Sequence, residues 1–324
     1  MGCMQTRLTE LLNVDHPIML AGMGGVSYNE LVAAVSEAGG FGCLGASVMG
    51  NDEMVSEIAA TAALTQKPFG VDLLTAAPQD MAAKVTAIAD GGATVFVAGL
   101  GVPREVIDLC HERGLLVVNM CGKVSHAIAA VDAGCDIVVA QGTEAGGHTG
   151  QVATLALVPQ VVDAVGAQVP VVAAGGIVDG RGLAAALGLG ADGIWVGTRF
   201  IASPEARAVP GYKEAILGGA DDGTMITRAY TGKTCRVLRT SYARDFEASG
   251  AVAQPFPGQV IKSMQDGANH LGGDEHTLGV DPSIEFMPAG QGIGAIQTLV
   301  PAGQMVQQFM AEAEQVLERL AAYR

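Results

Sequence analysis

The sequence predicts a closed barrel of eight parallel strands, a (β/α)8 TIM barrel, with a further segment inserted near its carboxyl end. Short apolar runs alternate eight times with patterns typical of helices. These runs are apolar throughout, as expected for strands that are buried on both faces. Glycines stand at the ends of the runs, where such barrels carry their binding loops. A doubly wound sheet is the alternative, and the eight regular repeats favour the barrel.

Composition sets limits on the class of protein. The chain has 324 residues, of which 49% are apolar and 16% charged, so it can bury a large core. A net charge of −15 makes it a poor candidate for binding nucleic acid, because phosphates are neutralised by Lys and Arg. No segment resembles a signal peptide or a membrane span, so we expect a cytoplasmic protein without membrane contact. The six cysteines form no C-x-x-C pair and are typical of reduced, buried thiols.

The strands and helices follow in order along the chain. The first strand is expected at 17–21, followed by a glycine-rich turn and a helix that begins at a capping box, Ser27 to Glu30. The later strands are expected at 41–44, 69–73, 94–98, 115–119, 136–140, 169–173 and 193–197. The helices between and after them are expected near 52–64, 79–89, 104–112, 124–133, 155–165 and 181–187.

The regular alternation ends after Phe200. Residues 210–290 are more polar and hold most of the aromatic residues outside the barrel units, which indicates an inserted, mainly helical subdomain over the barrel mouth. A last amphipathic helix, from Gln304 to about Ala321, is expected to pack back on the barrel. The predicted organisation is therefore a barrel formed by residues 1–209 and 291–324, and a substrate or lid subdomain formed by residues 210–290.

Residues 141–150 form a glycine-dense loop after the sixth predicted strand, and His148 lies within it. Glycines allow the backbone to approach a ligand closely, and we expect the loop to be flexible. A histidine in such a place can act near neutral pH as a base, an acid or a hydrogen-bond donor. The alternative is an exposed loop histidine without a chemical role. These residues alone leave the two interpretations open.

Two further glycine pairs mark a candidate phosphate site. The stretch 172–176 ends the seventh strand, and the stretch 193–199 ends the eighth. In barrels these two loops commonly bind phosphate through backbone N–H groups, which a side chain would obstruct. The alternative is a pair of ordinary strand-end turns. The pairing of loops seven and eight favours the phosphate site.

Other candidate residues have simpler interpretations. His270 and His276 flank two acidic residues, but their spacing matches no zinc signature, so a solvated acidic loop is predicted there. Cys43 and Cys121 lie at or just past strand ends. A nucleophile needs a nearby base, and no histidine is close to them in sequence, so small core residues explain these cysteines as well.

Five segments, taken together, resemble the nitronate monooxygenase (2-nitropropane dioxygenase) family, which includes flavin-dependent enoyl-acyl-carrier-protein reductases. The resemblance covers nearly the whole chain. The segments are Asp15-His-Pro-Ile-Met-Leu-Ala-Gly-Met23, Lys67-Pro-Phe-Gly-Val-Asp72, Gly142-Thr-Glu-Ala-Gly-Gly-His-Thr-Gly150, Ala174-Gly-Gly-Ile-Val-Asp-Gly-Arg-Gly182 and Val196-Gly-Thr-Arg-Phe200.

The resemblance implies a bound FMN and assigns its contacts. Ala21, Gly22 and Met23 would line the flavin ring, and His148 corresponds to the active-site histidine of the family. The residues implied to hold the flavin and its phosphate, with Gln141 beside them, are Gly146, Gly147, Gly175, Gly176, Gly197 and Thr198.

Two positions depart from the family pattern. Asp72, at a cofactor-binding position, stands where the family usually has asparagine, and Met120 stands where some members have lysine. A carboxyl group can donate a hydrogen bond as an amide does only when it is protonated. An ionised Asp72 near a flavin would also oppose the anionic reduced form. Both departures bear on the tuning of the flavin and on the substrate.

The resemblance implies oxidation of alkyl nitronates or nitroalkanes with O2 to a carbonyl compound and nitrite. His148 would abstract the α-proton of a neutral nitroalkane, or would orient and stabilise a bound nitronate. The alternative is an NAD(P)H-dependent reductase of enoyl thioesters, and a third hypothesis is a flavin-free binding protein, against which the glycine-dense loops argue. Both enzyme hypotheses imply a small-molecule substrate. The use of NAD(P)H as reductant and the formation of a homo-oligomer are left open by the sequence.

Overall fold

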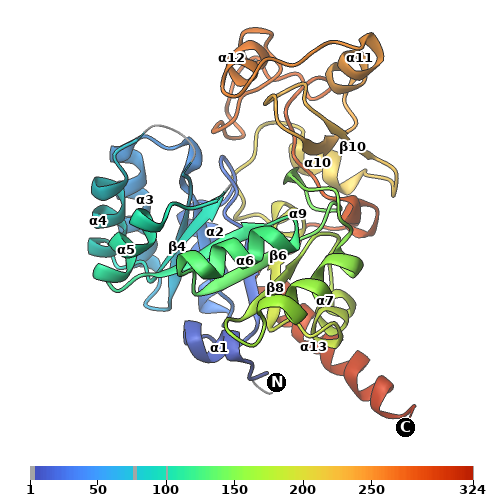
Figure 1. The fold of residues 1–324 in the computed structure, drawn as a ribbon. Helices are drawn as coiled ribbons and strands as arrows, with labels where there is room; N and C mark the ends of the chain where they lie inside the picture. Colours follow the sequence, from blue (N-terminus) through green and yellow to red (C-terminus); the bar gives the residue numbers. More distant parts are fainter. Residues whose placement is uncertain (1–3, 76–78, 100, 324) are drawn as a thin grey trace.

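A computed structural model of the chain describes residues 4–75, 79–99 and 101–323. It confirms the predicted TIM barrel: eight parallel strands stand in a ring with helices around them (Figure 1). The ring closes where the Ile18 carbonyl accepts from the Phe41 N–H and the Phe41 carbonyl accepts from the Leu20 N–H, both at 2.8 Å. The barrel strands are β1 (Ile18–Leu20), β2 (Gly42–Gly45), β3 (Phe69–Leu74), β4 (Val95–Gly99), β5 (Leu116–Cys121), β6 (Ile137–Gln141), β8 (Val171–Ala174) and β9 (Gly193–Val196).

Helices cover the outside of the barrel. They are α2 (Asn29–Glu37), α3 (Asn51–Leu64), α4 (Met81–Asp90), α5 (Arg104–Glu112), α6 (Val124–Ala133), α7 (Thr154–Val165) and α8 (Gly180–Gly188). The last helix, α13 (Ala302–Ala321), packs against α8 and α2 and so fills the remaining place in the ring. Gly180 makes this possible, because a Cβ on it would collide with the α13 backbone at Phe309 and Ala313.

The barrel interior is filled by side chains, as in other eight-stranded barrels. Met19, Phe41, Val97, Val139 and Trp195 belong to this interior cluster. A short helix that the sequence did not predict, α1 (Arg7–Leu12), adds Leu8 and Leu12 to the same cluster. Helix α1 therefore plugs the amino-terminal end of the barrel and leaves the other end for ligands.

The segment 210–290 lies over the carboxyl end of the barrel (Figure 1, yellow to orange), and we call it the roof. Its own core packs the Tyr230 ring against the rings of Tyr242 and Phe286, with centroids 5.1 and 4.9 Å apart. Strands join its helices: β10 (Thr224–Thr227) and β11 (Cys235–Leu238) pair antiparallel, and β11 also pairs with a two-residue strand of the barrel loop, β7 (Gly147–His148). The roof elements are α10 (Tyr212–Leu217), β10 (Thr224–Thr227), β11 (Cys235–Leu238), α11 (Ser241–Ser249) and α12 (Gly258–Gln265).

Short elements complete the chain: η1 (Ala46–Val48), α9 (Thr198–Ile201) and η2 (Gln291–Ala295). In the part of the chain that the structure describes, no helix is both long and apolar enough to cross a bilayer. The five cysteines among the described residues are buried and free of disulfides. Burial raises the pKa of the Cys121 thiol to about 12, so this thiol stays protonated at neutral pH and Cys121 packs as a core residue. Cys3 lies outside the described residues.

Candidate functional site

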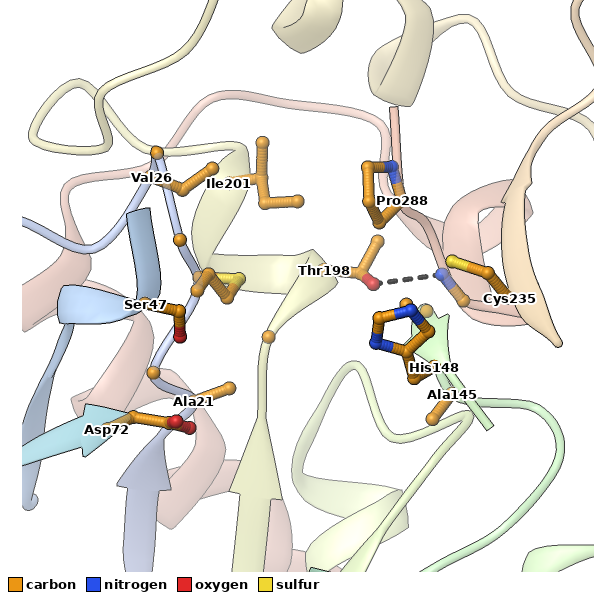
Figure 2. Close-up of a pocket in the computed structure, with 18 of the residues that line it drawn as sticks. Ala21, Val26, Ser47, Asp72, Ala145, His148, Thr198, Ile201, Cys235 and Pro288 are labelled. Atoms are coloured by element: carbon orange, nitrogen blue, oxygen red, sulfur yellow. Dashed lines mark hydrogen bonds between the residues drawn. The ribbon is translucent and has the colours of Figure 1, made fainter. Parts of the chain in front are cut away.

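A cavity of about 320 Å³ opens at the carboxyl ends of the barrel strands, beneath the roof. Figure 2 shows its walls, with Asp72 and Ala21 on one side and His148 and Cys235 on the other. Sites in such barrels are built from these strand ends. Every residue that the sequence predicted for the site lines this one cavity: Ala21, Gly22, Met23, Asp72, Gln141, Gly146, Gly147, His148, Gly175, Gly176, Gly197 and Thr198.

The turn after β1 is shaped by Ser27, and not as the sequence predicted. The Ser27 Oγ accepts from the Met23 N–H at 2.8 Å, within the turn itself. The predicted capping box is therefore wrong: the N-cap of α2 is Tyr28, without a side-chain hydrogen bond. A carboxylate from α3 takes over this task, since Glu57 Oε2 accepts from the Asn29 N–H at 3.2 Å. Ser27 instead fixes the backbone that borders the cavity.

Asp72 is a buried carboxyl group on β3 at the edge of the cavity. It lies so close to Gly22 that any side chain at position 22 would clash with it. Burial raises the pKa of Asp72 from 3.8 to about 8. The group is therefore mainly protonated at neutral pH and can donate one hydrogen bond, which is part of what an asparagine would do.

His148, in the loop expected to be flexible, has contacts on three sides. It pairs with Cys235 of β11 through strand β7. Its Nε2 lies 3.0 Å from the Thr231 hydroxyl, and the Gln141 Nε2 donates to its carbonyl at 2.7 Å. Burial, and secondarily the charge of Lys233, lowers the pKa of His148 from 6.5 to about 4. The imidazole is therefore neutral near pH 7, which suits hydrogen bonding better than proton abstraction.

The rest of the 141–150 loop is also tied to its surroundings. The Glu144 carboxylate accepts from the Thr154 N–H at 2.9 Å and from its hydroxyl at 2.9 Å, which caps helix α7. The Arg236 Nε, from the roof, donates to the Thr143 carbonyl at 2.8 Å. A Cβ on Gly146 would lie 2.8 Å from the Gly290 nitrogen. Barrel and roof together thus define the position of this loop.

The loops after β8 and β9 have the features of an anion site. Gly175 and Gly176 have φ angles of +107° and +72°, which favour glycine. Among the described residues, the Gly176 N–H donates to no other group, so it is available to a ligand. Thr198 begins the short helix α9, and its Oγ1 accepts from the Gly290 N–H at 3.0 Å (Figure 2, dashed line). This arrangement can hold a phosphate group by backbone amides.

The roof contributes cavity residues that sequence reasoning missed or misjudged. His270 lines the cavity and its Nδ1 lies 2.7 Å from the buried Glu285, so the predicted solvated loop is wrong for it. The same prediction holds for His276, whose side chain is 85% exposed. Cys235 and Thr231 reach His148 from the roof, and no local sequence pattern signals such contacts. Among the described residues, no group of three or more His, Cys, Asp or Glu is arranged to hold a metal.

Comparisons with known proteins find matches over most of this chain. A family model described as nitronate monooxygenase matches residues 5–84 and 75–312. The chain is 40% identical over 254 residues to a (3aS,4S,5R,7aS)-5-hydroxy-7a-methyl-1-oxo-octahydro-1H-indene-4-carboxyl-CoA dehydrogenase of Mycobacterium tuberculosis, covering 78% of this chain and 71% of the relative. It is 30% identical to a probable nitronate monooxygenase of Staphylococcus saprophyticus, covering 98% and 99%. The solved structure of FabK from Thermotoga maritima has a TM-score of 0.87 and 35% identity, covering 99% and 100%.

Proposed function

This chain belongs to the nitronate monooxygenase family, and we propose that it is an FMN-dependent oxidoreductase that converts alkyl nitronates and O2 into a carbonyl compound and nitrite. One observation carries the proposal. The twelve residues assigned to flavin and substrate come from five of the strand-end segments, and all line a single cavity.

The lining of the cavity supports FMN as the cofactor. The turn at Gly175 and Gly176, with the free N–H of Gly176, would hold the phosphate, because no Cβ blocks the approach of an anion there. The turn at Ala21 to Met23 follows β1, the neighbour of β9, and would border the flavin ring. When bound, FMN supplies the electron transfer between substrate and O2, and the protein supplies position and electrostatics.

His148 would bind the substrate as a neutral hydrogen-bonding group. A base with a pKa near 4 is poorly matched to removing a proton from carbon at neutral pH, whereas a nitronate is already deprotonated. The positive charge of Lys233, which lowers the pKa of His148, also favours an anion beside the ring. We therefore favour the nitronate over the neutral nitroalkane as the substrate that this geometry accepts.

The test is nitrite release from propyl-2-nitronate by the FMN-loaded enzyme, without NAD(P)H. We expect turnover, and we expect His148→Ala to retain FMN while kcat/KM falls by roughly ten- to a hundredfold, the effect of losing a positioning hydrogen bond. His276→Ala, on the exposed part of the roof, is the control. Absence of nitrite from the wild-type enzyme would refute the proposed reaction. Equal activity of the His148 and His276 variants would refute the role of His148.

A second candidate function is an NAD(P)H-dependent enoyl-thioester reductase. It is favoured by the 40% identity to a relative whose name describes a CoA-thioester dehydrogenase, and by a cavity that continues under the roof. In this reading residues 210–290 form a subdomain that covers an extended substrate. Rapid anaerobic bleaching of the flavin by NADH or NADPH, followed by reoxidation with crotonyl-CoA, would support it and would count against the monooxygenase.

A further inference from the structure

The cavity has a second end, away from the phosphate loops, where the roof meets the turn after β1. His270 and Glu285 line this end. The glutamate side chain is 1% exposed and the histidine side chain 24% exposed. A carboxyl group buried this deeply needs hydrogen-bond partners, and the histidine supplies them.

Glu285 fixes the orientation of the histidine ring. Its Oε1 accepts from the backbone N–H of His270 at 2.8 Å, and its Oε2 lies 2.7 Å from the ring Nδ1. Two donors on two carboxylate oxygens place the proton of a neutral ring on Nδ1. The Nε2 atom then carries a lone pair, and no described residue is hydrogen-bonded to it. It is the atom of this pair that is left for a ligand.

Apolar side chains make up much of the cavity wall beneath the roof. Val26, Ile201, Val209 and Phe286 line this part of the cavity. Tyr212 also lines it, but its hydroxyl already donates to the carbonyl of Pro288. A mainly apolar chamber with an oriented acceptor suits a chain-like ligand that carries an N–H or O–H group. A small nitronate has no such group to offer.

Backbone contacts hold the chamber in place. A Cβ on Gly25 would lie 2.8 Å from the Gly272 nitrogen, so the two segments touch. Both glycines have positive φ, +80° and +94°, a conformation that other residues rarely adopt. The segment that carries His270 is therefore seated directly on the turn that borders the proposed flavin ring.

We propose that His270, positioned by Glu285, accepts a hydrogen bond from an N–H or O–H group in the tail of an acyl-thioester substrate, the kind of group that the arm of CoA carries. The inference rests on the second candidate function and names the residue that would select its extended substrate. The thioester end would lie toward His148 and the flavin, and the tail would pass beneath the roof.

The test compares two α,β-unsaturated thioesters that differ in the tail. Crotonyl-CoA carries the CoA arm, whereas S-ethyl thiocrotonate has no N–H or O–H group. Binding to the FMN-loaded enzyme is followed by the change in flavin absorbance, without NAD(P)H, so no turnover is needed. We expect His270→Leu to weaken binding of crotonyl-CoA about five- to tenfold, the effect of one hydrogen bond, and to leave binding of S-ethyl thiocrotonate unchanged. His276→Leu is the matched control, because it removes an imidazole from the exposed part of the roof.

Glu285→Gln tests the positioning role. It keeps an acceptor for the backbone N–H but no longer fixes the proton on Nδ1, so the loss for crotonyl-CoA should be partial and again absent for S-ethyl thiocrotonate. Equal losses for both ligands, or no loss for either, would overturn the proposal. So would an oxidised enzyme that binds neither ligand. The nitrite assay is independent of these binding measurements. If the enzyme releases no nitrite from the nitronate, the binding measurements still test the role of His270.

Discussion

Replacement of Asp72 by asparagine tests whether a neutral carboxyl group stands at the edge of the flavin site. In the folded protein burial raises the pKa of Asp72 to about 8, from 3.8. Between these two values the unfolded chain has lost the proton and the folded chain keeps it, so stability falls as pH rises. One pKa unit corresponds to about 1.36 kcal/mol, so the wild-type protein should lose about 2.7 kcal/mol between pH 5 and pH 7 through this group alone.

The asparagine variant has no proton to lose at this position. Urea unfolding of FMN-free wild type and Asp72→Asn should therefore give similar stabilities near pH 4 and a growing advantage for the variant up to about pH 8, where the difference levels off. Asp90→Asn, at an exposed carboxyl group on α4, controls for the loss of one charge. A difference that stays constant with pH, or a wild type that gains relative stability as pH rises, would show that Asp72 is ionised in the fold and would refute the reasoning.

Two further replacements test the loops that border the cavity. Gly175→Ala should raise the Kd for FMN at least tenfold in a fluorescence titration, because φ is +107° there and the added Cβ would lie 2.7 Å from the Thr154 hydroxyl. Gly188→Ala, whose Cβ would meet no atom within 4 Å, is its control, and equal affinities would exclude Gly175 from the phosphate site. Ser27→Ala should lower the free energy of unfolding by about 1–3 kcal/mol, because the Met23 N–H loses its acceptor. An unchanged urea midpoint would mean that water replaces the Ser27 hydroxyl.

The barrel could be predicted from the sequence because each of its strands is recognisable from local residues alone. Buried parallel strands are continuous apolar runs, and their helices carry their own periodicity, so helices α5 and α6 begin and end where predicted. Strand ends were less predictable. Strand β5 runs on to Cys121 because Met120 and Cys121 pair with β6, and register with a neighbour is not written in the local sequence.

The helix start at Ser27 shows a different limit. A serine followed three residues later by glutamate is a good capping box in isolation. In the fold the Ser27 hydroxyl has a nearer donor, the Met23 N–H, and Glu57 supplies the acceptor for the helix. The capping motif is therefore replaced by two other hydrogen bonds. One joins Ser27 to Met23, four residues away, and the other joins Asn29 to Glu57 of another helix, a contact that the local sequence does not indicate.

The site residues also differ in whether local sequence or distant contacts determine their environment. The residues proposed to touch FMN lie on barrel loops, next to strands that the sequence reveals, and they line one cavity, while their contact with FMN stays a prediction. The residues that set the state of His148 lie elsewhere: Thr231 bonds its ring, Cys235 pairs with its backbone, and Lys233 lowers its pKa. The glycines of the 141–150 loop suggest flexibility, and nothing in its local sequence indicates that strand β11 of the roof pairs with it. Burial is the larger cause of the low pKa of His148 and Lys233 of the roof the smaller one, so the local sequence around His148 could not show that its imidazole is neutral near pH 7.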